Sequence, residues 1–108
     1  MNPATHSIIE CTIARHLVRL LLGAGYLVSV YDGGETTVRN SRDYETILAA
    51  LASTSEDSIR FRNEDGSEKG VFLLIWGNGK DLISDSSDNA ATERIQSEMD
   101  DIIDAIED

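Results

Sequence analysis

The pattern of hydrophobic and polar residues along the chain separates helical segments from strand-like ones. The most hydrophobic strand-like segment is 71–76, Val-Phe-Leu-Leu-Ile-Trp, which ends at Gly77-Asn78-Gly79. A strand that is hydrophobic on both faces is typical of a position where both faces are covered. We therefore predict that 71–76 is a central strand, with one face in the core of the domain and the other against a partner.

Three segments have the periodicity of helices. The first begins at Asn2-Pro3, a typical N-cap followed by proline, and ends near Leu22, before a glycine-rich stop. Its hydrophobic residues cover roughly 220° of the helix surface, against the ~100° that one buried face needs. This helix is therefore expected either to lie sandwiched between other elements or to join a subunit interface. A short helix follows a cap at Ser41, and the last helix runs from about Ala90 to the terminus.

Period-two alternation predicts four more strands, at 26–31, 36–40, 58–62 and 81–84. Turn sequences lie at Asp32-Gly33-Gly34, Asp65-Gly66 and Asn78-Gly79. The resulting order, α-β-β-α-β-β-β-α, predicts a single two-layer α+β domain with three helices and a five-stranded, mainly antiparallel sheet. The order of the strands in the sheet stays open, because the short helix can join its neighbouring strands in either direction.

The two sides of the predicted sheet differ in composition. We assign Val71, Leu73 and Ile75 to the side covered by helices. The opposite side then carries aromatic, aliphatic and arginine side chains, and its candidate interface residues are Tyr31, Arg39, Arg60, Arg62, Phe72, Leu74 and Trp76. Interface cores are enriched in these residue types, so we predict a protein–protein surface, most simply a homodimer joined face to face.

Two alternatives for this side of the sheet are left open. Helices on both sides would make it ordinary core. A platform for single-stranded nucleic acid would use the aromatic side chains to stack bases and the arginines to hold phosphates. The glycine–aromatic motif of such platforms is missing from the central strands, and the net charge of the chain opposes this alternative.

Acidic residues are concentrated near the C-terminus. The formal charge is −11; residues 1–80 contain 10 acidic and 8 basic residues, whereas residues 81–108 contain 10 acidic residues and one basic residue, Arg94. Direct binding to nucleic acid or to an anionic membrane is therefore not expected. The acidic face of the last helix is formed by Glu93, Asp100, Asp101, Asp104 and Glu107.

Two functions are open for this acidic face. Asp100 and Asp104 lie ~6 Å apart along a helix, close to the spacing of phosphates along a nucleic-acid strand. The face is therefore a candidate mimic of nucleic acid, in an inhibitor of a nucleic-acid-binding or defence protein. The alternative is a solvated surface that keeps the protein soluble.

Residues suited to catalysis or metal binding are few. Cys11 and His16 point to different sides of the first helix, so neither a nucleophile pair nor a zinc site is expected. Residues 77–80 lack the length and the hydroxyl of a phosphate-binding loop, and the aspartates between 81 and 88 lack the spacing of a calcium loop. We expect no catalytic residue, no metal and no cofactor, and a small enzyme with an unrecognised site is the remaining alternative.

The expected location is the cytoplasm. The chain has one cysteine, no signal-peptide pattern at its N-terminus and no hydrophobic run near the ~20 residues that span a bilayer. These features also argue against a membrane partner.

Three segments together resemble a group of known proteins: 28–34 (VSVYDGG), 58–62 (SIRFR) and 76–85 (WGNGKDLISD). They resemble small acidic accessory proteins encoded in phage and prophage genomes. The resemblance covers roughly residues 26–85 and consists of strand and turn patterns, so no functional residue carries over. It implies a small, intracellular, non-enzymatic protein; some phage proteins of this kind bind host proteins, including defence nucleases.

Overall fold

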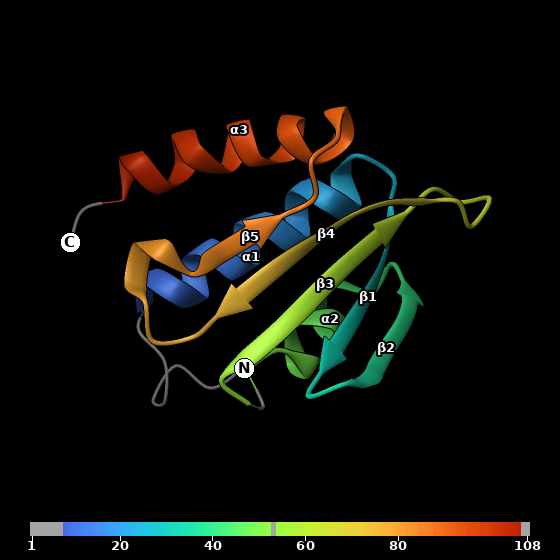
Figure 1. Ribbon diagram of the computed structural model, residues 1–108, viewed down its shortest axis with the longest axis horizontal. Coiled ribbons are helices and arrows are strands. Elements are labelled where there is room, and N and C mark those ends of the chain that lie inside the picture. The colour runs from blue at the N-terminus through green and yellow to red at the C-terminus, as the bar shows by residue number, and fades with distance from the viewer. Residues whose placement is uncertain (1–7, 53, 107–108) are drawn as a thin grey trace.

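A five-stranded antiparallel sheet forms one layer of the computed structural model, and three helices form the other, over residues 8–52 and 54–106, which the structure describes (Figure 1). The elements are α1 (Ile8–Gly23), β1 (Leu27–Asp32), β2 (Glu35–Ser41), α2 (Tyr44–Ala50), β3 (Glu56–Arg62), β4 (Glu68–Ile75), the 3-10 helix η1 (Gly79–Asp81), β5 (Ile83–Ser86) and α3 (Ala90–Ala105). The predicted α+β class and element order are confirmed. The predicted cap at Asn2-Pro3 lies outside the described residues.

The strand order, which the sequence left open, is β2-β1-β3-β4-β5. β1 pairs with β2 through a two-residue turn, in which Gly33 and Gly34 have φ of +61° and +90°. Both values lie in the left-handed region that the tight hairpin turns require and that glycine adopts without strain. α2 then carries the chain back across the sheet, so that β3 pairs antiparallel with β1.

The wide hydrophobic surface of α1 is explained by its position. α1 contacts α2, α3, β1 and η1, so it is covered on both flanks and by the sheet. The side chains that α1 buries are Glu10, Cys11, Ile13, Ala14, Leu17, Val18 and Leu21. The sandwiched alternative is therefore correct, and no subunit interface is needed to account for the hydrophobic surface of this helix.

A buried glutamate ties the start of α1 to the turn after β4. Glu10 is 3 % exposed, and its Oε2 accepts hydrogen bonds from the backbone N–H groups of Gly77 (2.7 Å) and Asn78 (3.3 Å). A buried carboxylate is stable only where such donors replace water. Glu10 therefore holds this end of the helix layer against the sheet.

The structure reverses the faces of β4 that the sequence analysis assigned. Phe72 and Leu74 are fully buried, and Trp76 is 7 % exposed; all three belong to the hydrophobic core. Val71, Leu73 and Ile75 are only half-buried. The prediction that Phe72, Leu74 and Trp76 belong to an interface is therefore wrong: these three residues hold the fold together.

The pairing of β4 with β3 explains the reversal. Ile59 lies opposite Phe72, and Phe61 lies opposite Gly70. Directly opposed residues of antiparallel strands share one face of the sheet. Because Ile59 and Phe61 are fully buried, Phe72 must lie on the core side. Gly70 is required there, since a Cβ at this position would lie 2.1 Å from Oγ1 of Thr92 on α3.

Two predicted boundaries are also corrected. The N-cap of α2 is Asp43 rather than Ser41: its carboxylate accepts from the N–H of Glu45 (3.2 Å) and from the hydroxyl of Thr46 (2.6 Å). The Thr46 hydrogen bond, with those of the backbone, lowers the pKa of the Asp43 carboxyl. The chain after β4 passes through η1 instead of a tight hairpin turn, so the last strand is Ile83–Ser86 rather than 81–84.

Candidate functional site

The face of the sheet that points away from the helices is the first candidate site, and we call it the open face (Figure 1). Strand pairing places one side chain from every second position on it. The positions on β1, β3, β4 and β5 are Leu27, Ser29, Tyr31, Glu56, Ser58, Arg60, Arg62, Val71, Leu73, Ile75 and Asp85. Most of these residues are half-buried, while Glu56 and Asp85 are exposed. The open face is thus partly hydrophobic and accessible.

Tyr31 and Arg60 form the best-defined contact on the open face. The guanidinium carbon of Arg60 lies 4.5 Å from the centre of the Tyr31 ring. A cation–π contact of this kind contributes about 0.5–1 kcal/mol at an exposed site and restricts the arginine side chain. Tyrosine and arginine are also the residue types that most often anchor protein interfaces. The contact therefore presents a positioned cation on an aromatic surface.

Two hollows meet on the open face at Val71. One has a volume of about 500 Å³ and is bordered by Tyr31, Ser58 and Arg60, together with the Gly33-Gly34 turn. The other, of about 240 Å³, is bordered by Leu73 and Asp85. Both hollows are open to solvent and partly lined by hydrophobic and aromatic side chains, which suits them to the side chains of a protein partner.

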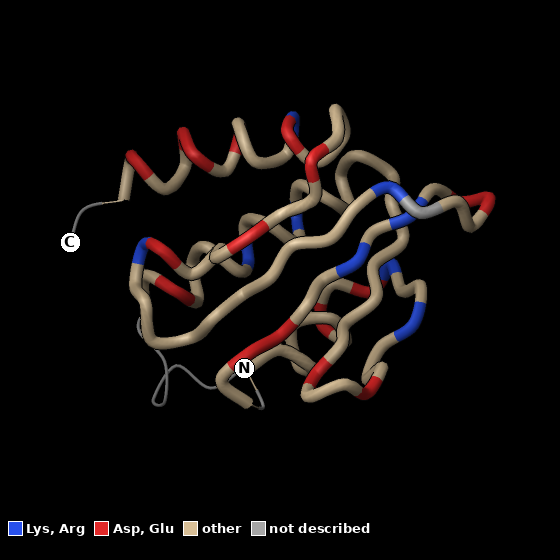
Figure 2. The backbone as a smooth tube through the Cα atoms, in the orientation of Figure 1, with Lys and Arg blue, Asp and Glu red and all other residues tan. Residues whose placement is uncertain are grey.

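The charges on the open face are separated along the strands. Arg60 and Arg62 lie near the end where β3 passes into β4, and Glu56 lies at the opposite end of β3. In Figure 2, blue segments lie on β3 and β4 toward the turn that joins them, and a red segment lies at the opposite end of β3, while the turn itself and β5 also contain red segments. β3 therefore has a basic end and an acidic end, and Ser58, Leu73 and the exposed Asp85 lie level with one another between them.

The structure keeps four of the predicted interface residues at the surface. Tyr31, Arg60 and Arg62 lie on the open face, and Arg39 is exposed on the edge strand β2. Val71, Leu73 and Ile75 also lie on the open face, although the sequence pattern led us to expect them in the core. The pairing of β3 with β4 was the signal that could have found them, because Ile59 and Arg60 already showed which side of β3 faces the core.

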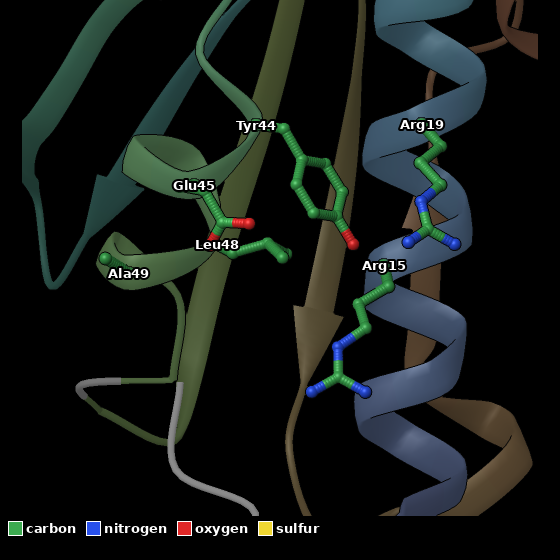
Figure 3. A pocket seen from close by; sticks show the side chains of 6 residues that line it. All are labelled: Arg15, Arg19, Tyr44, Glu45, Leu48 and Ala49. Carbon is green, nitrogen blue, oxygen red and sulfur yellow. The ribbon is translucent and has the colours of Figure 1, made fainter.

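A second candidate is a groove between α1 and α2, which we call the helix groove (Figure 3). It has a volume of about 480 Å³ and is lined by Arg15, Arg19, Tyr44, Glu45, Leu48 and Ala49. The guanidinium carbon of Arg19 lies 5.1 Å from the centre of the Tyr44 ring. No sequence pattern predicts this groove, since arginines on the polar side of a helix are usually solvated.

The acidic face of α3 is the third candidate. Glu93, Asp100, Asp101 and Asp104 are all exposed, and red segments follow one another along this helix in Figure 2. Glu107, the fifth predicted member of the face, lies outside the described residues. The last turn of α3 contains no basic residue.

Side chains suited to metal binding are not brought together in the described part of the chain. No group of three or more His, Cys, Asp and Glu side chains there could hold a metal ion. Cys11 is buried. Over the same residues, no helix is both long and hydrophobic enough to cross a bilayer.

Comparisons of the chain with protein-family models, with curated proteins and with solved structures find no match. The candidate functional surfaces of the protein are therefore the open face, the helix groove and the acidic face of α3.

Proposed function

We propose that the protein is a non-catalytic interaction module that forms a homodimer through the open face of its sheet. The observation that carries this proposal is the half-buried hydrophobic strip of Val71, Leu73 and Ile75 on β4, beside the Tyr31–Arg60 contact. Burial of such a strip against a second copy removes hydrophobic surface from water, which is the main favourable contribution to association. Arginine and tyrosine at its border match the composition of interface centres.

The separation of charge supports one arrangement of the two copies. A two-fold axis running along β3 would place Arg60 over Arg60 of the second copy, whereas an axis across the strands at Ser58 places it over Glu56 of the second copy. Like charges in contact oppose association, so the second arrangement is the favourable one for β3. It also sets Asp85, which lies opposite Leu73 on the edge strand β5, against its own copy. It is compatible with the angle of about 30° at which aligned sheets pack.

The hydrophobic residues fit the same arrangement. With the axis near Ser58, midway between Glu56 and Arg60 on β3, the opposite residue Leu73 on β4 meets its own copy. Val71 then meets Ile75 of the second copy, so hydrophobic side chains face each other along β4. The small side chain of Ser58 leaves room for the sheets to approach.

Charge reversals test this arrangement. Arg60→Glu and Glu56→Arg should each raise the dimer dissociation constant about tenfold or more, because each creates two contacts between like charges. An equimolar mixture of the two variants should form a heterodimer, since both contacts then pair opposite charges. Sedimentation velocity of each variant and of the mixture measures these outcomes.

The matched controls are Arg94→Glu and Glu98→Arg, which make the same changes at exposed positions of α3. They should leave the dissociation constant unchanged. Circular dichroism would show whether Arg60→Glu still folds after losing its contact with Tyr31. A dimer that tolerates both single reversals would contradict the proposed arrangement of the copies.

The acidic face of α3 supports a second candidate function, inhibition of a nucleic-acid-binding protein by charge mimicry. Asp101 and Asp104 lie near the C-terminus of the helix, where the macrodipole disfavours negative charge by about 0.3–1 kcal/mol per residue. Helix stability therefore does not account for these residues. The resemblance to phage and prophage accessory proteins is consistent with such a function.

A capture experiment distinguishes mimicry from a solvated helix. If α3 mimics nucleic acid, a nucleic-acid-binding protein captured from the native host should be displaced by DNA. It should also be lost when Asp100 and Asp104 are replaced by lysine. Glu35→Lys together with Asp81→Lys, at exposed positions outside α3, is the charge-matched control. Equal capture by both double variants would contradict mimicry.

A further inference from the structure

The helix groove combines two arginines that lie on one side of α1. Arg15 and Arg19 are four residues apart, so their Cα atoms lie ~6 Å apart along the helix axis and their side chains share a face. Figure 3 shows both side chains beside the groove, with the hydroxyl of Tyr44 between α1 and α2. Tyr44 and Glu45 come from the first turn of α2, which the Asp43 cap holds in place.

The positive charge of the two arginines in this groove is only partly balanced, by the carboxylate of Glu45. The ion pair found among the described residues joins Arg42 and Glu64, and neither Arg15 nor Arg19 takes part in one. Glu45 lines the groove but forms no such pair with them. The Tyr44 ring orients Arg19 without neutralising it. Two like charges one turn apart repel each other, so an anion bound between them would be favourable.

We propose that the helix groove binds a phosphate monoester. A phosphoryl group carries a charge of about −1.5 to −2 at pH 7, which matches two guanidinium groups. Its three terminal oxygens can accept hydrogen bonds from two planar guanidinium groups and from the hydroxyl of Tyr44. A single carboxylate would leave one guanidinium without a counter-charge.

The other residues of the groove restrict the ligand. The carboxylate of Glu45 repels a second anionic group, so the rest of the ligand is neutral or cationic. Leu48 and Ala49 offer a hydrophobic wall to its carbon atoms. Nucleic acid, a polyanion, is disfavoured by the net charge of −11. A phosphorylated small molecule and a phosphoserine side chain share the required chemistry.

The groove lies on the helix layer, and the open face is the opposite surface of the sheet (Figure 1). Formation of the proposed dimer would therefore leave the groove accessible. The phosphate site and the homodimer can be tested independently, because failure of one does not affect the other.

Titration of the full chain followed by NMR tests the proposal. The probes are inorganic phosphate, a phosphoserine peptide and the same peptide without phosphate. Inorganic phosphate and the phosphopeptide should shift amide signals of α1 and α2, and the unphosphorylated peptide should not. Tighter binding of the phosphopeptide than of inorganic phosphate would indicate a protein source, and equal binding a small-molecule source.

Substitutions distinguish a specific phosphate-binding site from weak, nonspecific binding of phosphate to the protein surface. Arg15→Gln and Arg19→Gln should each weaken phosphate binding about tenfold or more, because a charge-assisted hydrogen bond is lost. Glu45→Gln should strengthen binding, since it removes a repulsive charge. Arg94→Gln, at an exposed position of α3, should have no effect. Absence of any shift with phosphate, or equal binding by Arg15→Gln and Arg94→Gln, would overturn the proposal.

Discussion

Phe72→Ala should lower the free energy of unfolding by about 3–5 kcal/mol, the usual effect of truncating a buried phenylalanine. Phe72 is fully buried, and its ring centre lies 5.8 Å from that of Phe61. Truncation removes this contact and leaves a cavity that the surrounding side chains fill only in part. Urea denaturation followed by circular dichroism, at a concentration where the chain is monomeric, measures the loss.

The neighbouring residue Leu73 provides the matched comparison. Leu73 is half-buried on the open face, so Leu73→Ala should lower the free energy of unfolding of the monomer by less than about 1.5 kcal/mol. The same variant should weaken the proposed dimer. If Leu73→Ala destabilised the monomer more than Phe72→Ala did, the faces of β4 would be those expected from the sequence alone, and the open face would be wrongly assigned.

The second large effect is expected at Asp57, where Asp57→Ala should lower the free energy of unfolding by about 3 kcal/mol or more. Asp57 is 1 % exposed. Its Oδ2 accepts hydrogen bonds from Nε1 of Trp76 (2.8 Å) and from the backbone N–H of Ala52 (2.7 Å). Each donor left without an acceptor in the core costs about 1–3 kcal/mol.

Asp57 also supports an unfavourable backbone conformation. Ala52 has φ of +65°, in the left-handed region that residues other than glycine rarely adopt. The hydrogen bond to Asp57 stabilises this conformation after α2. Loss of the carboxylate should therefore loosen the connection between α2 and β3 in addition to releasing Trp76.

Trp76→Phe isolates one part of this network, because it removes the indole donor and keeps an aromatic ring. It should lower the free energy of unfolding by less than Asp57→Ala does. A double-mutant cycle of the two substitutions should give a coupling energy of about 1–3 kcal/mol.

In the Asp57→Ala variant, fluorescence of Trp76, the single tryptophan of the chain, should shift to longer wavelength. If the free energy of unfolding of Asp57→Ala lay within about 0.5 kcal/mol of the wild-type value, this role for Asp57 would be contradicted.

The sequence predicted the elements of the fold correctly wherever hydrophobic and polar residues alternate with a clear period. β3 is an example: Ile59 and Phe61 are buried, and Arg60 lies on the open face, as their alternation indicates. Segment 71–76 has no such period. Which of its side chains face the core is decided by its pairing with β3. The register of that pairing depends on the five-residue connection from Asn63 to Ser67.

The candidate site was therefore predictable only in part. Tyr31, Arg60 and Arg62 could be placed on the open face, because each alternates with buried neighbours on its own strand. Val71 and Leu73 could not be placed without the pairing of β3 with β4. The helix groove depends on the side-by-side packing of α1 and α2, and no local pattern in either helix encodes that packing.

The most direct test of the proposed homodimer is the mass of the wild-type protein in solution. Sedimentation equilibrium over a range of concentrations should give twice the monomer mass of 11.8 kDa, and Arg60→Glu should shift the equilibrium toward the monomer. A wild-type mass of 11.8 kDa at every concentration would contradict the proposal that the open face joins two copies of this chain.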